Sequence, residues 1–273
     1  MSDWISSDTS RYCAMGTVEQ TQSSRGTSLA VLAINTKGGY GELINSSPFD
    51  TNGIMVCLSP YNVGSRCLVD IAIGPIGSEQ VIVNNLHIDN VINDQISVSF
   101  CFPVAIPGQT RIAARMQSSS ASAKLAIAGH LLSSGFADVS PLGKVTTYGV
   151  DMSDSGGTQI DPGAIAGVKG AWAQIVSNTT SPITKLAIVI GGDTNSIRAN
   201  SSWLLDIGIG SSGSETVLIN NLPLVFHENY IFPKIIGPMS VSIPTATRIA
   251  VRAQSTNVDA TDRLFDIALY GVS

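Results

Sequence analysis

LVDIAIGPIGSEQVIVNNL, residues 68–86, returns later in the chain as LLDIGIGSSGSETVLINNL, residues 204–222. The two stretches are identical at twelve of nineteen positions. A second block, VAIPGQTRIAARMQS at 104–118, returns in the same order as VSIPTATRIAVRAQS at 241–255, with ten of fifteen identities. Self-similarity over this distance indicates that a whole domain was duplicated, because solenoid repeats are much shorter.

The repeated blocks alternate between apolar and polar residues. Val69, Ile71 and Ile73 fall on one face of an extended chain, and TRIAARMQ at 110–117 alternates in the same way. Clusters of Gly, Pro, Asn and Ser interrupt such runs about every ten residues, which is typical of sandwiches and barrels built from short strands. We therefore predict an all-β protein of two tandem jelly-roll-like β-sandwich domains, with little or no helix.

The extent of the repeat sets the predicted domain boundaries. KGGYGELI, starting at Lys37, matches KGAWAQIV, starting at Lys169, so the copies correspond over most of their length. The turn-rich string SSGFADVSPLGK separates them. We predict a tail at 1–15, a first sandwich at 16–135, a linker at 136–148 and a second sandwich at 149–273. SASAKLAIAGHLL, from Ser120, also fits a helix, but its counterpart DRLFDIALYGV alternates, so we predict a strand in both copies.

Composition narrows the classes of partner. Of 273 residues, 44% are hydrophobic and 13% are charged, about half the ~25% usual in soluble proteins. We expect such a weakly charged surface to be covered in part by other subunits. The net charge is −5 and Lys and Arg form no run, so we expect no nucleic-acid partner. The sequence contains no secretion signal and no apolar stretch of about 20 residues, so we expect no membrane partner.

The duplication also tests candidate catalytic and metal-binding residues, because residues kept in both copies serve the fold. His87, His130 and His227 are not repeated and lack metal-ligand spacing, so we expect surface or packing roles for them. Cys13, Cys57, Cys67 and Cys101 form no C-x-x-C motif and are interpreted as small hydrophobes. We expect no metal and no cofactor.

The string GIGSSG at 208–213 matches a dinucleotide-binding pattern, but a predicted strand follows it where that motif needs a helix. We interpret it as a hairpin turn. Paired carboxylates are the other enzymatic option: Asp70 with Glu79, or Asp206 with Glu215, as acid and base in glycoside cleavage.

Arginines repeated beside these carboxylates favour a structural interpretation instead. Opposite charges on facing strands form cross-strand ion pairs. We predict that each aspartate forms such a pair in a partly buried polar layer and that the protein is not an enzyme. The predicted pairs are Asp70 with Arg111 or Arg115, and Asp206 with Arg248 or Arg252.

The predicted tail carries Trp4 and Ile5 among Ser and Asp residues. A short segment with two large apolar side chains suits a groove on a neighbouring subunit. We predict that these residues anchor the chain in an assembly.

The strings at 169–176, 206–215 and 248–254 resemble a family of tailed-bacteriophage virion proteins, and the first copy resembles it with Tyr40 in place of Trp. Members of that family are structural, decoration or tail-associated proteins without catalytic residues. The resemblance implies a virion component, made in the host cytoplasm, that coats or bridges capsid or tail subunits. We expect a homo-oligomer, with a trimer as one candidate, because a trimer of tandem domains presents six similar modules. The alternative is a host-attachment module that binds surface glycans through its loops.

Overall fold

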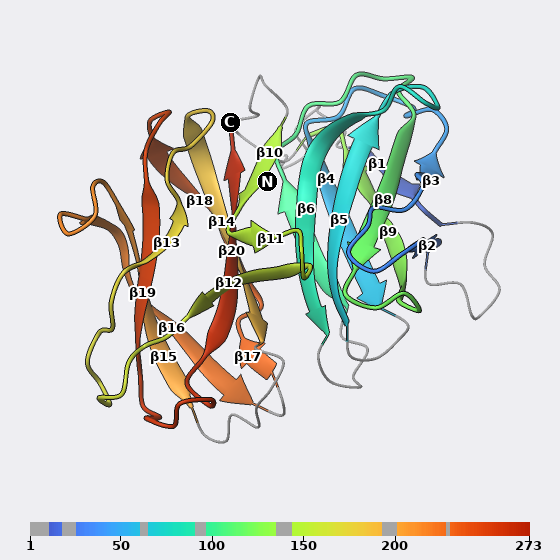
Figure 1. Ribbon diagram of the computed structural model, residues 1–273. Coiled ribbons are helices and arrows are strands. Elements are labelled where there is room, and N and C mark those ends of the chain that lie inside the picture. The colour runs from blue at the N-terminus through green and yellow to red at the C-terminus, as the bar shows by residue number, and fades with distance from the viewer. Residues whose placement is uncertain are drawn as a thin grey trace, which may run out of the picture.

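The computed structural model describes residues 11–17, 26–60, 65–90, 97–134, 144–192, 201–227 and 230–273, and within them every regular element is a β-strand. Figure 1 shows two sandwiches side by side, with the N-terminal copy in blue to green and the C-terminal copy in yellow to red. The predicted all-β fold of two tandem sandwiches is confirmed.

The strands of the first sandwich are β1 (Tyr12–Met15), β2 (Thr27–Ala30), β3 (Gly41–Ile44), β4 (Gly53–Pro60), β5 (Ser65–Ile73), β6 (Gln80–Asn90), β7 (Val98–Phe102), β8 (Ile112–Ser118) and β9 (Lys124–Leu132). One sheet has the order β1-β9-β4-β7, with β2 also paired to β9, and the other runs β3-β8-β5-β6. A five-stranded and a four-stranded sheet in this order form a jelly roll.

The strands of the second sandwich are β10 (Val145–Tyr148), β11 (Val150–Asp151), β12 (Gly156–Ile160), β13 (Ala173–Val176), β14 (Ile183–Gly192), β15 (Ser202–Ile209), β16 (Thr216–His227), β17 (Tyr230–Phe232), β18 (Ile235–Ile243), β19 (Ile249–Ser255) and β20 (Phe265–Val272). Strands β10 and β12 both pair with β20, which continues through β14 to β18, and the facing sheet runs β13-β19-β15-β16-β17. The second copy therefore repeats the jelly-roll order of the first.

The sandwiches begin earlier than the predicted boundaries. β1 lies inside the predicted tail at 1–15 and pairs with β9, and β10 lies inside the predicted linker at 136–148 and pairs with β20. These strands are only four residues long, too short for alternation to reveal them. The ambiguous segment after Ser120 forms the strand β9.

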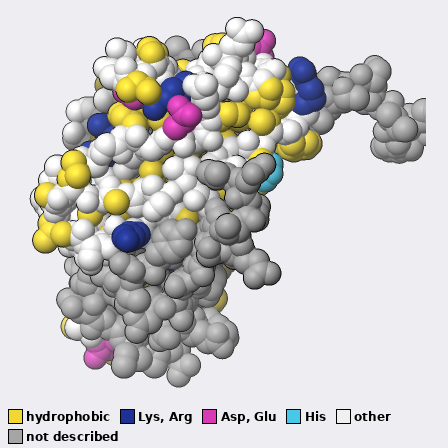
Figure 2. Space-filling model, turned by 90° about the vertical axis from the view of Figure 1, so that its right-hand side faces the viewer, with side chains coloured by type: hydrophobic (Ala, Val, Ile, Leu, Met, Phe, Trp, Pro, Cys, Tyr) yellow, Lys and Arg dark blue, Asp and Glu magenta, His cyan; other side chains and the backbone are white. Residues whose placement is uncertain are grey.

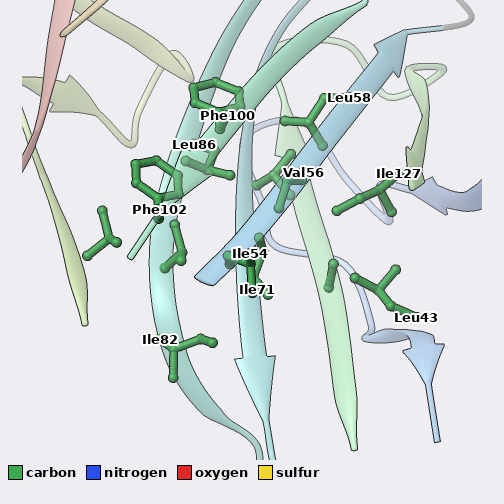
Figure 3. Close-up of a cluster of buried hydrophobic side chains, with 14 of the residues drawn as sticks. Leu43, Ile54, Val56, Leu58, Ile71, Ile82, Leu86, Phe100, Phe102 and Ile127 are labelled. Atoms are coloured by element: carbon green, nitrogen blue, oxygen red, sulfur yellow. The ribbon is translucent and has the colours of Figure 1, made fainter. Parts of the chain in front are cut away.

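The first core lies between the two sheets of its sandwich. On β4, the side chains of Ile54, Val56 and Leu58 are fully buried, whereas the intervening residues are half-buried, so the strand alternates as predicted. Figure 3 shows these three side chains directed toward the same cluster as Phe100 and Phe102 of β7. Complete burial of one such side chain contributes about 1.5–3 kcal/mol.

Strand β20 departs from this alternation, since all eight of its residues are buried. Leu269 belongs to the core of the second sandwich, whereas Ala268, Tyr270 and Val272 belong to the core cluster of the first. The sheet containing β20 therefore packs against both sandwiches. Figure 1 shows β10, β11 and β12 at the same junction between them.

Candidate functional site

An ion-paired cluster is centred on Asp70, which lies on β5 on the face turned away from the core. Arg115 of β8 is the direct cross-strand neighbour of Asp70, and its Nε donates to Asp70 Oδ2 at 3.0 Å. Lys37 donates from Nζ to Asp70 Oδ1 at 2.8 Å, and the backbone N–H of Asn85 donates to the same oxygen at 2.9 Å. Three donors thus hold a carboxylate that is only 3% exposed.

The second sandwich repeats this cluster. Arg252 is the cross-strand neighbour of Asp206 and donates from Nε to Asp206 Oδ2 at 3.0 Å. Lys169 donates to Asp206 Oδ1 at 2.7 Å, and the backbone N–H of Asn221 donates to it at 2.9 Å. Charged hydrogen bonds of this kind are stronger than neutral ones, so the same device fixes one sheet face in each copy.

The backbone beside each aspartate supplies the third donor. The register of β5 with β6 shifts next to Asp70, and the register of β15 with β16 shifts next to Asp206. At these irregularities Asn85 and Asn221 adopt φ values of 51° and 53°. Asn tolerates this left-handed conformation better than most residues, which accounts for the repeated NNL string.

An aromatic ring covers the arginine of each cluster. The guanidinium carbon of Arg115 lies 4.7 Å from the centre of the Tyr40 ring, and that of Arg252 lies 4.5 Å from the centre of the Trp172 ring. At these distances the ring face attracts the cation. The repeated KGGY and KGAW strings therefore provide both the lysine that binds the aspartate and the ring that stacks on the arginine.

The size of that ring matches the residue beneath it. A Cβ atom built on Gly208 would lie 2.8 Å from Cη2 of Trp172, closer than such contacts occur. The corresponding residue of the first copy is Ala72, and there the ring is the smaller Tyr40. The larger Trp172 ring is thus matched with Gly208, and the smaller Tyr40 ring with Ala72.

A second repeated ion pair lies near the end of each sheet. Arg111 donates from Nη1 to Glu79 Oε1 at 3.1 Å, and Arg248 donates from Nη1 to Glu215 Oε1 at 2.8 Å. The same Nη1 atoms also donate to the backbone carbonyls of Gly74 and Gly210, both at 3.2 Å. These arginines therefore tie the turn after β5 or β15 to the neighbouring strand.

The structure distinguishes between the two arginines considered for each aspartate. Arg115 and Arg252, which lie directly opposite the aspartates, make the ion pairs with them. Arg111 and Arg248 contact the glutamates instead.

Sequence reasoning missed the two lysines and the two aromatic rings of these clusters. Their signal was present, because they belong to the repeated strings that begin at Lys37 and Lys169. The predicted anchor residues Trp4 and Ile5 lie outside the described residues.

The surroundings of the carboxylates in the second sandwich keep them ionised. Burial raises the pKa of Asp206, but hydrogen bonds from Lys169, Asn221 and Arg252 outweigh it and hold the pKa below its usual value. The pKa of Glu215 is also lowered, because its own backbone N–H and the nearby arginine outweigh burial. A general acid near neutral pH needs a raised pKa, so these groups are suited to act as fixed anions.

Each cluster lines a hollow in the surface. The hollow of the second sandwich measures about 480 Å³ and is lined by the Asp206 cluster together with Val217 and Asn220. The corresponding hollow of the first sandwich measures about 290 Å³. Lys144 and Met152 of the second sandwich line it as well, so the next domain partly covers this hollow.

The edge of β6 is where the second sandwich joins the first. Val145 of β10 forms a parallel bridge with Val83 of β6 and links the sheets of the two copies. The backbone N–H of Thr147 donates to Asn84 Oδ1 at 2.9 Å, and its hydroxyl donates to the Asn84 carbonyl. Strand β10 therefore covers an edge that would otherwise be free.

Tyr270 of β20 fills the apolar centre of the junction. Its ring packs edge-on against Phe100 and Phe102, with centroid distances of 5.6 and 5.8 Å. Its hydroxyl accepts a hydrogen bond from the backbone N–H of His87 at 2.8 Å. Tyr270 and His87 are both fully buried, so the first core is completed by a residue of the second sandwich.

Polar contacts surround this centre. Arg66 lies 2.9 Å from Asp154 and 3.0 Å from Asp266, and Asp266 is only 2% exposed. Gln117 donates from Nε2 to Ser155 Oγ at 3.0 Å. A buried ion pair of this kind is costly to break from one side, which makes the junction specific.

The second sandwich presents the corresponding surface without a cover. Pro223 stands where the first copy has His87, and Ser202 stands where it has Arg66. Val217 and Val225 of β16 are 41% and 49% exposed. Among the residues that the structure describes, the junction therefore occurs once.

No group of three or more His, Cys, Asp or Glu that could hold a metal ion occurs among the described residues. The four cysteines have free thiols. The described part of the chain contains no helix with the length and apolarity needed to cross a membrane.

No family model and no curated protein matches the chain. Among solved structures, the CBM22-1-CBM22-2 tandem domain of Paenibacillus barcinonensis Xyn10C aligns over 97% of this chain and 92% of its own, with 9% identity and a TM-score of 0.29. A structure described as the triple jelly-roll fold and turret assembly of an archaeal virus aligns over 87% of this chain, with 11% identity and a TM-score of 0.25. The alignment covers 55% of that viral chain.

Proposed function

We propose that the chain is a non-enzymatic structural subunit of a virus particle, which coats or bridges capsid or tail subunits through the surfaces of its two jelly rolls. The observation that carries the proposal is the contrast between two equivalent strand edges. The edge of β6 is buried by the next sandwich, whereas the same edge of β16 is exposed. A module that buries this edge in one copy and exposes it in the other has an unused docking surface.

The repeated charges support the same proposal. In both copies the carboxylates and arginines neutralise one another within the sandwich. Figure 2, which views the first-sandwich side of the molecule, shows hydrophobic side chains at many places on the described surface and few charged ones. Such a surface is suited to close contact with other subunits. The resemblance to tailed-bacteriophage virion proteins points to a particle as the place of those subunits.

Cryo-electron microscopy of particles from the virus that encodes the chain tests this function. We expect pairs of jelly-roll densities on the capsid or tail that disappear when the gene is deleted. Particles with unchanged density and unchanged protein content after the deletion would overturn the proposal.

A second candidate is glycan binding by the open hollow of the second sandwich. It combines Asp206, Arg252 and Asn220 with Trp172 beside them, and aromatic rings next to polar groups suit sugars. Glycan-array binding that is lost with Asn220→Ala but kept with Ser211→Ala, in an exposed turn, would favour it. Absence of binding by the unaltered protein would dismiss it.

A further inference from the structure

We infer that the exposed edge of β16 binds the first sandwich of a second copy of this chain, which repeats between chains the junction found within the chain. The inference rests on the proposed function and names the partner. The face offered by the second copy is the outer surface of its β1-β9-β4 strands, which corresponds to the β10-β20-β14 surface at the internal junction.

At the exposed edge of β16, repeated apolar residues are less buried than their counterparts in β6. Val83 and Leu86 of β6 are fully buried, whereas their counterparts Ile219 and Leu222 of β16 are half-buried although their neighbours along the strand are the same residue types. Between 217 and 222, β16 pairs only with β15 among the described strands, since β17 pairs further along. An unpaired apolar edge of this kind is a template for another strand.

The face that would dock has the same strand register as the one used inside the chain. At the internal junction, Ala187 lies opposite Tyr270 and Val189 lies opposite Ala268. On the first sandwich the corresponding pairs are Met55 opposite His130 and Cys57 opposite Ala128. Met55, Cys57 and Ala128 are half-buried and His130 is exposed, so this largely uncharged face is accessible on the described surface.

The hydrogen-bonded pair at the centre of the junction changes on both sides together. Inside the chain, the N–H of His87 donates to the Tyr270 hydroxyl. On the exposed surfaces Pro223 has no N–H to donate, and His130 has no phenol hydroxyl to accept. Docking would therefore leave no backbone N–H at position 223 buried without its acceptor, which would be costly at a new interface.

The ion pair of the internal junction is also absent from both exposed surfaces. Arg66 binds Asp266 at the internal junction. In the repeat, Arg66 corresponds to Ser202 on the exposed edge. The registers of β4-β9 and β14-β20 show that Asp266 corresponds to Ala126 of β9, which is fully buried and carries no charge. Removal of only one charge would have left the other to be buried alone, whereas both are absent here.

The contact between Thr147 and Asn84 can be repeated at the exposed edge. Asn84 accepts the backbone N–H of Thr147, and Asn220 occupies the same position on the exposed edge. The counterpart of Thr147 on β1 is Ala14, which lacks the hydroxyl but has the N–H.

Contacts between unlike surfaces of identical chains are heterologous, so repetition of the contact closes a ring or extends a filament.

A complementation experiment tests the inference with the full-length chain. Asn220→Lys places a charge at the exposed edge, and His130→Lys places one on the docking face. Both sites are exposed, so we expect both variants to fold. Ile76→Lys, at an 80% exposed residue in the turn between β5 and β6, is the matched control. Circular dichroism confirms folding, and sedimentation velocity measures mass.

We expect the unaltered protein and the control to grow in mass with concentration, and each variant alone to stay at the 28.5 kDa of one chain. An equimolar mixture of the two variants should form a species of twice that mass and no larger, because each pair retains one intact contact. A monomeric unaltered protein up to about 1 mM, association of His130→Lys alone, or a monomeric mixture would overturn the inference. The particle experiment decides the proposed function separately, whatever the result here.

Discussion

Strands β6 and β16 carry nearly the same residues, VIVNNL and VLINNL, yet their burial differs. Ile82, Val83 and Leu86 of β6 are buried, whereas Leu218, Ile219 and Leu222 of β16 are half-buried. Strand β6 is covered by β10 and Tyr270 of the following sandwich. Among the described strands, β16 pairs with β15 and β17 only, and its equivalent edge is half-buried or exposed. The comparison teaches that burial of this strand is determined by its neighbour, because its own sequence is almost unchanged.

Replacement of Tyr270 should lower the free energy of unfolding the most. Tyr270→Ala removes a fully buried ring from the first core and should lower the free energy of unfolding by about 3–5 kcal/mol. His130→Ala, at the equivalent exposed position, should change it by about 0.5 kcal/mol or less. Urea titration measures both values. Equal effects at the two positions would show that the junction contributes no stability.

The aspartate clusters are the same in both sandwiches, so removal of either aspartate should have a similar effect. Asp70→Ala and Asp206→Ala each leave a lysine and an arginine without their shared carboxylate, so each should lower the free energy of unfolding by about 2–4 kcal/mol. Urea titration with a fluorescence readout checks this. A loss below about 1 kcal/mol in either copy would contradict the structural role of that cluster.

A fall in pH should destabilise the fold, because it favours protonation of His87, which is buried at the junction. The second copy has Pro223 at the equivalent position. Burial, followed by the charges of Arg66 and Lys234, lowers the pKa of His87 to about 3. The unfolded chain binds this proton below about pH 6.5, so the contribution to stability is complete above pH 6.5 and is lost as the pH falls toward 3.

The expected loss is about 1.4 kcal/mol per pH unit, or roughly 2 kcal/mol at pH 5. Urea titrations at several pH values should show this slope for the unaltered protein and a smaller slope for His87→Leu. The same slope in both proteins would mean that His87 is not buried in its neutral form.

Changes to the match between each aromatic ring and the strand residue beneath it should have the smallest effect on the free energy of unfolding. Gly208→Ala forces a Cβ against Trp172 and should cost about 1–2 kcal/mol. Tyr40→Trp should be destabilising beside Ala72 and should be rescued by Ala72→Gly. A double-mutant cycle measures this coupling, and purely additive effects would show that ring and strand do not constrain each other.

The duplication and the period-two alternation were enough to predict the fold. The alternation failed only where strands were too short, as in β1 and β10, or where both faces were buried, as in β20. Burial of the second face of β20 depends on another domain, and no local pattern of residues records it.

The aspartate clusters were partly predictable, because their charges are repeated. Asp70 and Arg115 lie on neighbouring strands, so cross-strand pairing could be anticipated. Lys37 and Tyr40 reach the same place from a loop, and sequence spacing does not reveal such an approach.

The junction could not be predicted from repetition. Arg66, His87 and Tyr270 each occur in one copy only, and the interpretation of unrepeated residues assigned His87 to a surface or packing role. Unrepeated residues within otherwise repeated strands mark the place where one sandwich meets the next. The junction can be located from these residues only when the strand registers show which of them face one another.

Hydrogen exchange measured by mass spectrometry on the full-length chain compares the accessibility of the β6 and β16 edges. In dilute protein, amides of β6 around Val83 and Asn84 should be protected, and amides of β16 around Ile219 and Asn220 should exchange faster. A rise in protein concentration should slow exchange in β16 and leave β6 unchanged. Equal protection of the two strands in dilute protein would contradict the account, because it would mean that the edge of β16 is not free.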